Sequence, residues 1–134
     1  MKKVLLLLLV LSALMLAACG GSSKADAAAT LAPVPAEYAG RTNPLGADAA
    51  SAGADVFRTN CDACHGPQGH GDGPASAALN PAPRNLPELV KVATDDYFFW
   101  RISTGKDGTS MVAWQGVLTD EQIWQVIVYI RTLQ

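Results

Sequence analysis

Two cysteines and a histidine lie within one helical turn in the run Cys61-Asp62-Ala63-Cys64-His65. In a protein exported from the cytoplasm, a C-x-x-C-H run is typical of the covalent attachment of a c-type haem. The two thiols add across the two vinyl groups of the porphyrin, and the next imidazole reaches the iron from the same side. The pattern therefore predicts one covalent haem c on Cys61 and Cys64, with His65 as an axial iron ligand.

Three other interpretations of the run explain less of it. A thioredoxin-like dithiol would follow a β-strand in a βαβ pattern, and no strand-like run precedes Cys61. A zinc site would need two further ligands, and the only spare candidate is His70. A plain disulfide between Cys61 and Cys64 would leave His65 without a role.

The predicted second axial ligand is Met111. The chain has three methionines, and Met1 and Met15 fall in the N-terminal leader, so Met111 is the only one expected in the mature protein. A thioether ligand stabilises ferrous iron relative to a second imidazole and so raises the reduction potential. His70 as the ligand, an open or water-ligated iron, and a gap-filling role for Met111 in the core are the alternatives. Filled axial positions leave no site for substrate and favour electron transfer.

The N-terminus has the pattern of an export signal. Lys2 and Lys3 precede an apolar stretch over residues 4–16, which is shorter than the roughly 20 residues of a membrane span. The run 16–19, Leu-Ala-Ala-Cys, resembles a bacterial lipobox. This resemblance implies a signal peptide over residues 1–18 and a lipid on Cys19, which would anchor the protein outside the cytoplasm, on the periplasmic side of a membrane or at the cell surface. An ordinary cleaved signal peptide and an uncleaved anchor are the alternatives.

The composition divides the remaining chain into two parts. Residues 19–46 are rich in Gly, Ser, Ala and Pro, which predicts a flexible tether after the lipidated Cys19. The alternative is that part of this stretch packs along the domain in a fixed path. Residues 47–134 form the predicted domain. The formal charge of −2 becomes −4 without Lys2 and Lys3, which argues against nucleic acid as a partner.

The domain is predicted to be all-α, with three principal helices over residues 48–60, 95–104 and 119–133. Their expected N-caps are Asp48 or Ser51, then Thr94, and then Thr119, which has Gln122 in the capping-box position. Residues 66–74 and 80–83 carry the Gly and Pro of loops.

Gly53 lies inside the first predicted helix, where glycine costs about 1 kcal/mol relative to alanine. We therefore expect the last helix to cross there so closely that no Cβ fits. Phe57 lies one turn further on and would contact Tyr129 of the last helix.

Other residues are expected to contact the haem or its ligand. A haem-ligating histidine donates its second ring N–H to a carbonyl, and the carbonyls of Pro81 and Pro83 are candidates. Trp100 and Arg101 could reach a haem propionate, with core packing of Trp100 and solvation of Arg101 as the alternatives.

Residues 47–134 resemble the class I mono-haem cytochromes c. The residues that match this family in order and spacing are Gly53, Phe57, Cys61, Cys64, His65, the run 111–114 (Met-Val-Ala-Trp) and Tyr129. The resemblance implies an all-α cytochrome c class I fold, with three principal helices around the haem. The chain departs from many members of the family at Val112, where they have proline after the methionine ligand.

A second resemblance concerns the loops 71–74 (Gly-Asp-Gly-Pro) and 80–83 (Asn-Pro-Ala-Pro). Together with the lipobox they are similar to mono-haem lipoprotein cytochromes of bacterial respiratory complexes, including the quinol-oxidising alternative complex III. This implies a membrane-tethered carrier of single electrons between respiratory or photosynthetic complexes. Its expected partners are a quinol-oxidising complex and a terminal oxidase or soluble carrier. The alternative function is a haem c sensor or peroxidase-like protein with a displaceable Met111.

Overall fold

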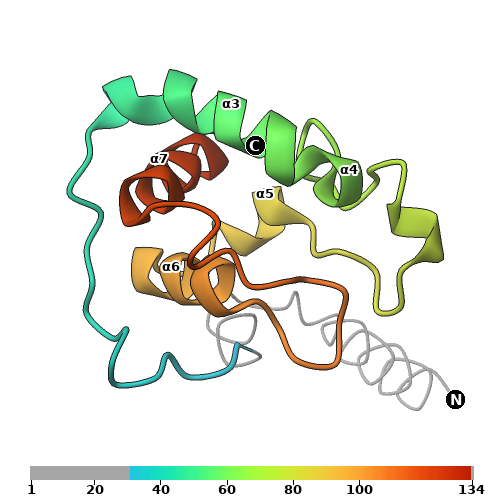
Figure 1. The fold of residues 1–134 in the computed structure, drawn as a ribbon, viewed down its shortest axis with the longest axis horizontal. Coiled ribbons are helices and arrows are strands. Elements are labelled where there is room, and N and C mark those ends of the chain that lie inside the picture. Colours follow the sequence, from blue (N-terminus) through green and yellow to red (C-terminus); the bar gives the residue numbers. More distant parts are fainter. Residues whose placement is uncertain (1–30, 134) are drawn as a thin grey trace, which may run out of the picture.

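The computed structural model describes residues 31–133, and Figure 1 shows their arrangement. Apart from one isolated bridge between Gln115 and Leu118, all regular structure in this part of the chain is helical. The elements are η2 (Ala47–Ala49), α3 (Ala50–Asn60), α4 (Asp62–His65), η3 (Ser76–Ala78), α5 (Leu86–Leu89), α6 (Asp95–Thr104) and α7 (Asp120–Ile130). The three principal helices of the prediction correspond to α3, α6 and α7. None of the described helices is long and apolar enough to cross a membrane.

The predicted leader 1–18, Cys19 and residues 20–30 lie outside the described residues. Residues 31–46 follow a fixed path beside α6 and α7, which is the alternative to a flexible tether (Figure 1). The backbone N–H of Gly40 donates to Asp96 Oδ2 at 2.8 Å, and Asn43 Nδ2 donates to the carbonyl of Trp124 at 3.0 Å. Four apolar side chains of this segment also pack on the core: Leu31, Val34, Tyr38 and Leu45. These contacts hold the segment despite its composition.

The predicted close crossing of α3 and α7 is confirmed. A Cβ placed on Gly53 would lie 2.0 Å from the carbonyl oxygen of Gln125 and 2.9 Å from Tyr129 Cβ. One turn later, the rings of Phe57 and Tyr129 lie 5.2 Å apart between centroids. The two backbones can therefore meet only where a side chain is missing.

The predicted caps of the first two helices are wrong in detail. Neither Asp48 nor Ser51 caps α3, because the turn η2 precedes it and the N–H of Ala50 bonds to the carbonyl of Ala47 instead. Thr94 occupies the N-cap position of α6 but makes no side-chain cap. Its hydroxyl donates to Asp96 Oδ1, which also accepts from the N–H of Tyr97 at 2.8 Å.

The last helix begins as predicted and ends early. Thr119 and Gln122 form the reciprocal capping box, with bonds of 2.9 and 3.2 Å. Helix α7 ends at Ile130, and a turn carries the chain on to Leu133, whose side chain is buried. Apolar side chains of α7 form the centre of the core, with Ile123, Val126 and Ile127 fully buried.

Arg131 joins the end of α7 to the connection between α5 and α6. Its guanidinium donates to Asp95 Oδ1 at 2.9 and 2.6 Å, and to the carbonyls of Val90 and Ala93 at 3.0 and 2.9 Å. The structure shows a side chain that fixes α5 relative to α6 and α7.

The crossing predicts the effect of adding one methyl group at position 53. In an ordinary helix Gly53→Ala would stabilise, but here the new Cβ meets the backbone of α7. We expect a loss of about 2 to 3 kcal/mol in the free energy of unfolding, measured by denaturant titration of the haem-containing protein. Ser51→Ala, on an exposed position of the same helix, should change stability by less than about 0.5 kcal/mol. Equal stability of Gly53→Ala and the native protein would contradict the crossing.

Candidate functional site

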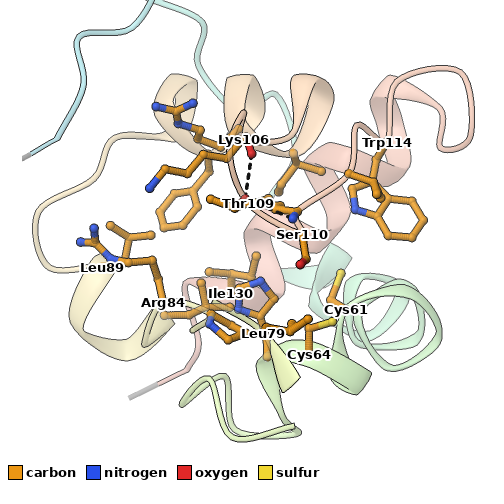
Figure 2. A pocket seen from close by; sticks show the side chains of 18 of the residues that line it. Cys61, Cys64, Leu79, Arg84, Leu89, Lys106, Thr109, Ser110, Trp114 and Ile130 are labelled. Carbon is orange, nitrogen blue, oxygen red and sulfur yellow. Dashed lines mark hydrogen bonds between the residues drawn. The ribbon is translucent and has the colours of Figure 1, made fainter. Parts of the chain in front are cut away.

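The C-x-x-C-H run forms a compact turn at the end of α3. Cys61 lies between the two helices as the C-cap of α3 and the N-cap of α4, and its carbonyl accepts from the N–H groups of Cys64 at 3.2 Å and His65 at 2.9 Å. Gly66, with φ 76°, ends the turn. Figure 2 shows both thiols, Cys61 and Cys64, at the edge of a single cavity, and His65 also lines it.

This cavity has a volume of about 230 Å³ and walls that are mostly apolar. Besides the turn, it is lined by residues of the 79–89 segment, of α6, of the loop 106–114 and of α7. In the view of Figure 2, Thr109 and Ser110 of the loop lie above the cavity, and Leu79 and Cys64 lie below it. Segments that are far apart in the sequence therefore enclose the space beside the thiols.

Met111 reaches the cavity from a loop that is bonded to α6. The N–H of Lys106 donates to the carbonyl of Met111 at 3.0 Å, and the N–H of Trp114 donates to the carbonyl of Ile102 at 3.0 Å. At Gly105, with φ 70°, a Cβ would lie 2.5 Å from the Met111 carbonyl oxygen. Backbone bonds on both sides of Met111 thus restrain the loop in which Val112 replaces the proline of many cytochromes.

The environment of His65 favours a neutral imidazole. Burial lowers the pKa of His65 below its usual value, and the backbone of Arg84 offsets part of this effect. Nδ1 is buried without a partner at full hydrogen-bond geometry, so the contact with Arg84 is a weak one. Pro81 and Pro83 also line the cavity, but the backbone that acts on the imidazole belongs to the residue after Pro83. A neutral imidazole is the form that binds a metal.

The cysteines do not have the character of a redox dithiol. Burial, then the charges of Cys64 and Asp62, raise the pKa of Cys61 to about 12. A reactive dithiol needs a lowered thiol pKa, and the shift at Cys61 is in the opposite direction. His70, the spare ligand of the zinc alternative, is exposed and is not part of the cavity.

The residues around the cavity fit a haem. Two thiols, one neutral imidazole and one thioether meet a space with aromatic and aliphatic walls, which suits a flat apolar macrocycle with one metal ion. Arg101 lines the cavity, whereas Trp100 does not.

One wall of the cavity, the short helix α5, was not predicted from the sequence. It buries Leu86 and Leu89 against the space. The Asn85 side chain caps this helix by accepting from the N–H of Glu88 at 3.2 Å. Asn85 followed by Pro87 and Glu88 was the signal in the sequence that could have indicated it.

A comparison with protein families gives a match over residues 48–130 to the family described as "Cytochrome C oxidase, cbb3-type, subunit III". The chain belongs to this family of cytochrome c domains. The covalent haem c and the all-α cytochrome c fold predicted from the sequence are thereby confirmed. The single C-x-x-C-H run makes the protein a mono-haem cytochrome.

Two relatives agree with this assignment. The cytochrome is 36% identical over 86 residues to cytochrome c6 of Thermosynechococcus vestitus, across 64% of this chain and 70% of the relative. It is also 36% identical over 78 residues to cytochrome c6 of Parathermosynechococcus lividus, across 58% and 83% of the two chains.

A solved structure shares the fold. It is a chain of the reducing HAO-like protein complex of Kuenenia stuttgartiensis, with a TM-score of 0.60 and 23% identity. The match covers 81% of the cytochrome but 54% of that chain, so the cytochrome spans about half of the length of this neighbour. At this identity the likeness concerns the fold alone.

The cavity predicts that the domain depends on its cofactor. Phe57, Leu86 and Ile130 belong both to the core and to the cavity wall. Without the cofactor these apolar side chains would face water in an open cavity, and the lost apolar burial would be a large fraction of the small stability of such a domain. We expect Cys61→Ala/Cys64→Ala, which cannot attach haem, to lose most of its helical circular dichroism. The native holo-protein is the control, and a well-folded haem-free variant would contradict the prediction.

Proposed function

We propose that this cytochrome is a membrane-tethered electron carrier that transfers single electrons between respiratory or photosynthetic complexes. The observation that carries the proposal is the meeting of the Cys61–His65 turn and Met111 at one cavity. When bound, haem c supplies a one-electron couple between ferric and ferrous iron. The membership of the cytochrome c family and the similarity to cytochromes c6 support this chemistry.

In this proposal each site residue has one role. Cys61 and Cys64 hold the haem by thioether bonds, and His65 and Met111 are the axial ligands. The lowered pKa of His65 favours the neutral imidazole that the iron would bind, and the backbone bonds of the 106–114 loop would hold Met111 in place. With both axial positions filled by the chain, no site is left for a substrate.

An apolar surface beside the cavity is the proposed contact for redox partners. Val112 lines the cavity and is 60% exposed, so it connects the site to the surface. Ala63, Pro67 and Ala113 are also exposed. Apolar contact rather than long-range charge attraction would then determine the association, and its rate would depend weakly on salt.

The proposed anchor is a lipid on Cys19, and the proposed partners are a quinol-oxidising complex, such as alternative complex III, and a terminal oxidase or soluble carrier. The lipobox and the loops 71–74 and 80–83 support this choice. Because residues 31–46 pack on the domain, residues 19–30 would be the part of the chain between the packed segment and the anchor. Twelve residues span at most about 43 Å, which would keep the domain close to the membrane surface.

Replacing Met111 tests the axial ligand and the function together. The native ferric protein should show the near-infrared band of methionine bound to iron, and Met111→Ala should lose it. The reduced native protein should not bind carbon monoxide at once, because both axial positions are filled, whereas reduced Met111→Ala should bind it rapidly.

Val112→Ala is the matched control beside Met111. It should keep the near-infrared band, and its reduced form should not bind carbon monoxide at once. A band that survives in Met111→Ala would disprove the ligand assignment. Rapid carbon monoxide binding by the native protein would favour the sensor or peroxidase-like alternative, in which Met111 is displaceable.

Replacing the third cysteine tests the anchor. Cells grown with radioactive fatty acid should label the native protein and not Cys19→Ser, because only the thiol of Cys19 can carry the lipid. The variant should also appear in the soluble extracytoplasmic fraction. Equal labelling of both proteins would exclude Cys19 as the lipidation site.

A further inference from the structure

The loop that follows the attachment turn is bonded to the turn through its backbone. Three alternate N–H groups of this loop donate to three consecutive carbonyls of the turn. The bonds run from Gly71 to His65 at 2.8 Å, from Gly73 to Cys64 at 3.2 Å and from Ala75 to Ala63 at 2.9 Å. They give partners to carbonyls at the end of α4 that no N–H of the helix itself can reach.

Gly71 meets a second backbone on its other side. A Cβ at position 71 would lie 2.4 Å from the carbonyl oxygen of Pro83 and 3.6 Å from the carbonyl carbon of Arg84. The same loop accepts from the N–H of Leu86 through the carbonyl of Gly69, at 2.7 Å. The loop therefore passes between the attachment turn and the segment around Arg84, and at position 71 there is no room for a side chain.

Both of these backbones act on His65. On one side, the N–H of Gly71 holds the main-chain carbonyl of His65. On the other side, the backbone of Arg84 is the one that acts on the buried Nδ1 of the imidazole. The size of residue 71 therefore sets how far this ring nitrogen lies from its backbone partner. A hydrogen bond from this nitrogen raises the basicity of an imidazole that binds a metal.

We propose that Gly71 is a positioning residue for the iron ligand His65, and that the missing side chain at position 71 lowers the reduction potential through the bond on Nδ1. A more basic imidazole donates more electron density to the iron and favours the ferric state. A side chain at position 71 would move the two backbones apart, weaken this bond and favour the ferrous state. The proposal rests on His65 as an axial ligand, and it does not depend on Met111, the tether or the partners.

Potentiometric titration of the holo-protein tests this role. In Gly71→Ala we expect the ratio of ferrous to ferric haem at a fixed potential to rise at least about threefold, which is a rise of about 28 mV for one electron. Gly40→Ala is the matched control, because Gly40 has φ 78° against 81° at Gly71 but no atom within 4 Å of a Cβ placed on it. This control carries the same backbone strain and should keep the native potential.

Exchange of the His65 ring N–H with water, followed by nuclear magnetic resonance, tests the bond directly. The exchange should be slow in the native holo-protein, because the N–H is bonded to the backbone, and faster in Gly71→Ala. The measurement on the native protein decides the question even if Gly71→Ala does not fold, since rapid exchange there would overturn the proposal.

Other results would also overturn it. One is an unchanged or lower potential in folded Gly71→Ala. Another is an equal rise in Gly40→Ala, because backbone strain alone would then explain the shift. The near-infrared band should persist in Gly71→Ala, and a shift accompanied by its loss would place the change at Met111 instead. Failure of the proposed Met111 ligand would be seen separately, as the absence of this band from the native protein.

Discussion

The contact between α3 and α7 at Gly53 is the constraint on which the rest of the structure depends. The carbonyl of Gln125 lies where a Cβ would be, so the two helices pack with backbone against backbone. Helix α3 runs directly into Cys61, and α7 contributes Ile130 to the cavity wall. The crossing therefore sets the distance between the attachment turn and the wall that faces it. Arg131, at the end of α7, extends this control to α5 and α6 through Asp95 and two carbonyls.

The parts of the structure that could be predicted from the sequence are those with a local signal. Three such signals each lie within a few residues of the sequence: the C-x-x-C-H run, the glycine inside a helix and the Thr119–Gln122 capping box. Met111 was chosen as the expected ligand because it is the only methionine outside the predicted leader. Such signals identified the attachment turn, the close crossing and the loop that shares the cavity.

The parts that could not be predicted depend on contacts between distant segments. The path of residues 31–46 depends on Arg41, whose guanidinium lies 5.1 Å from the ring of Phe99 in α6, and on the bond between Gly40 and Asp96. Composition alone indicates a polar, proline-containing stretch, and it does not show which residues of α6 this stretch contacts. The capping of α6 was mispredicted for a related reason: Thr94 and Asp96 both offer oxygens, and only the folded geometry shows that the carboxylate accepts the N–H of Tyr97.

Sharing of side chains between core and cavity connects stability to redox chemistry. Phe57, Leu86 and Ile130 belong to the hydrophobic core and also line the haem cavity. A small domain therefore gains apolar contact from its cofactor that its own side chains do not supply. The same packing limits how far the site can move when the iron changes charge, because a close-packed wall resists displacement. The loop with Met111 is restrained by backbone bonds to α6 rather than by proline at position 112. A site held in this way needs little rearrangement between its two redox states, which is the physical requirement for rapid electron transfer.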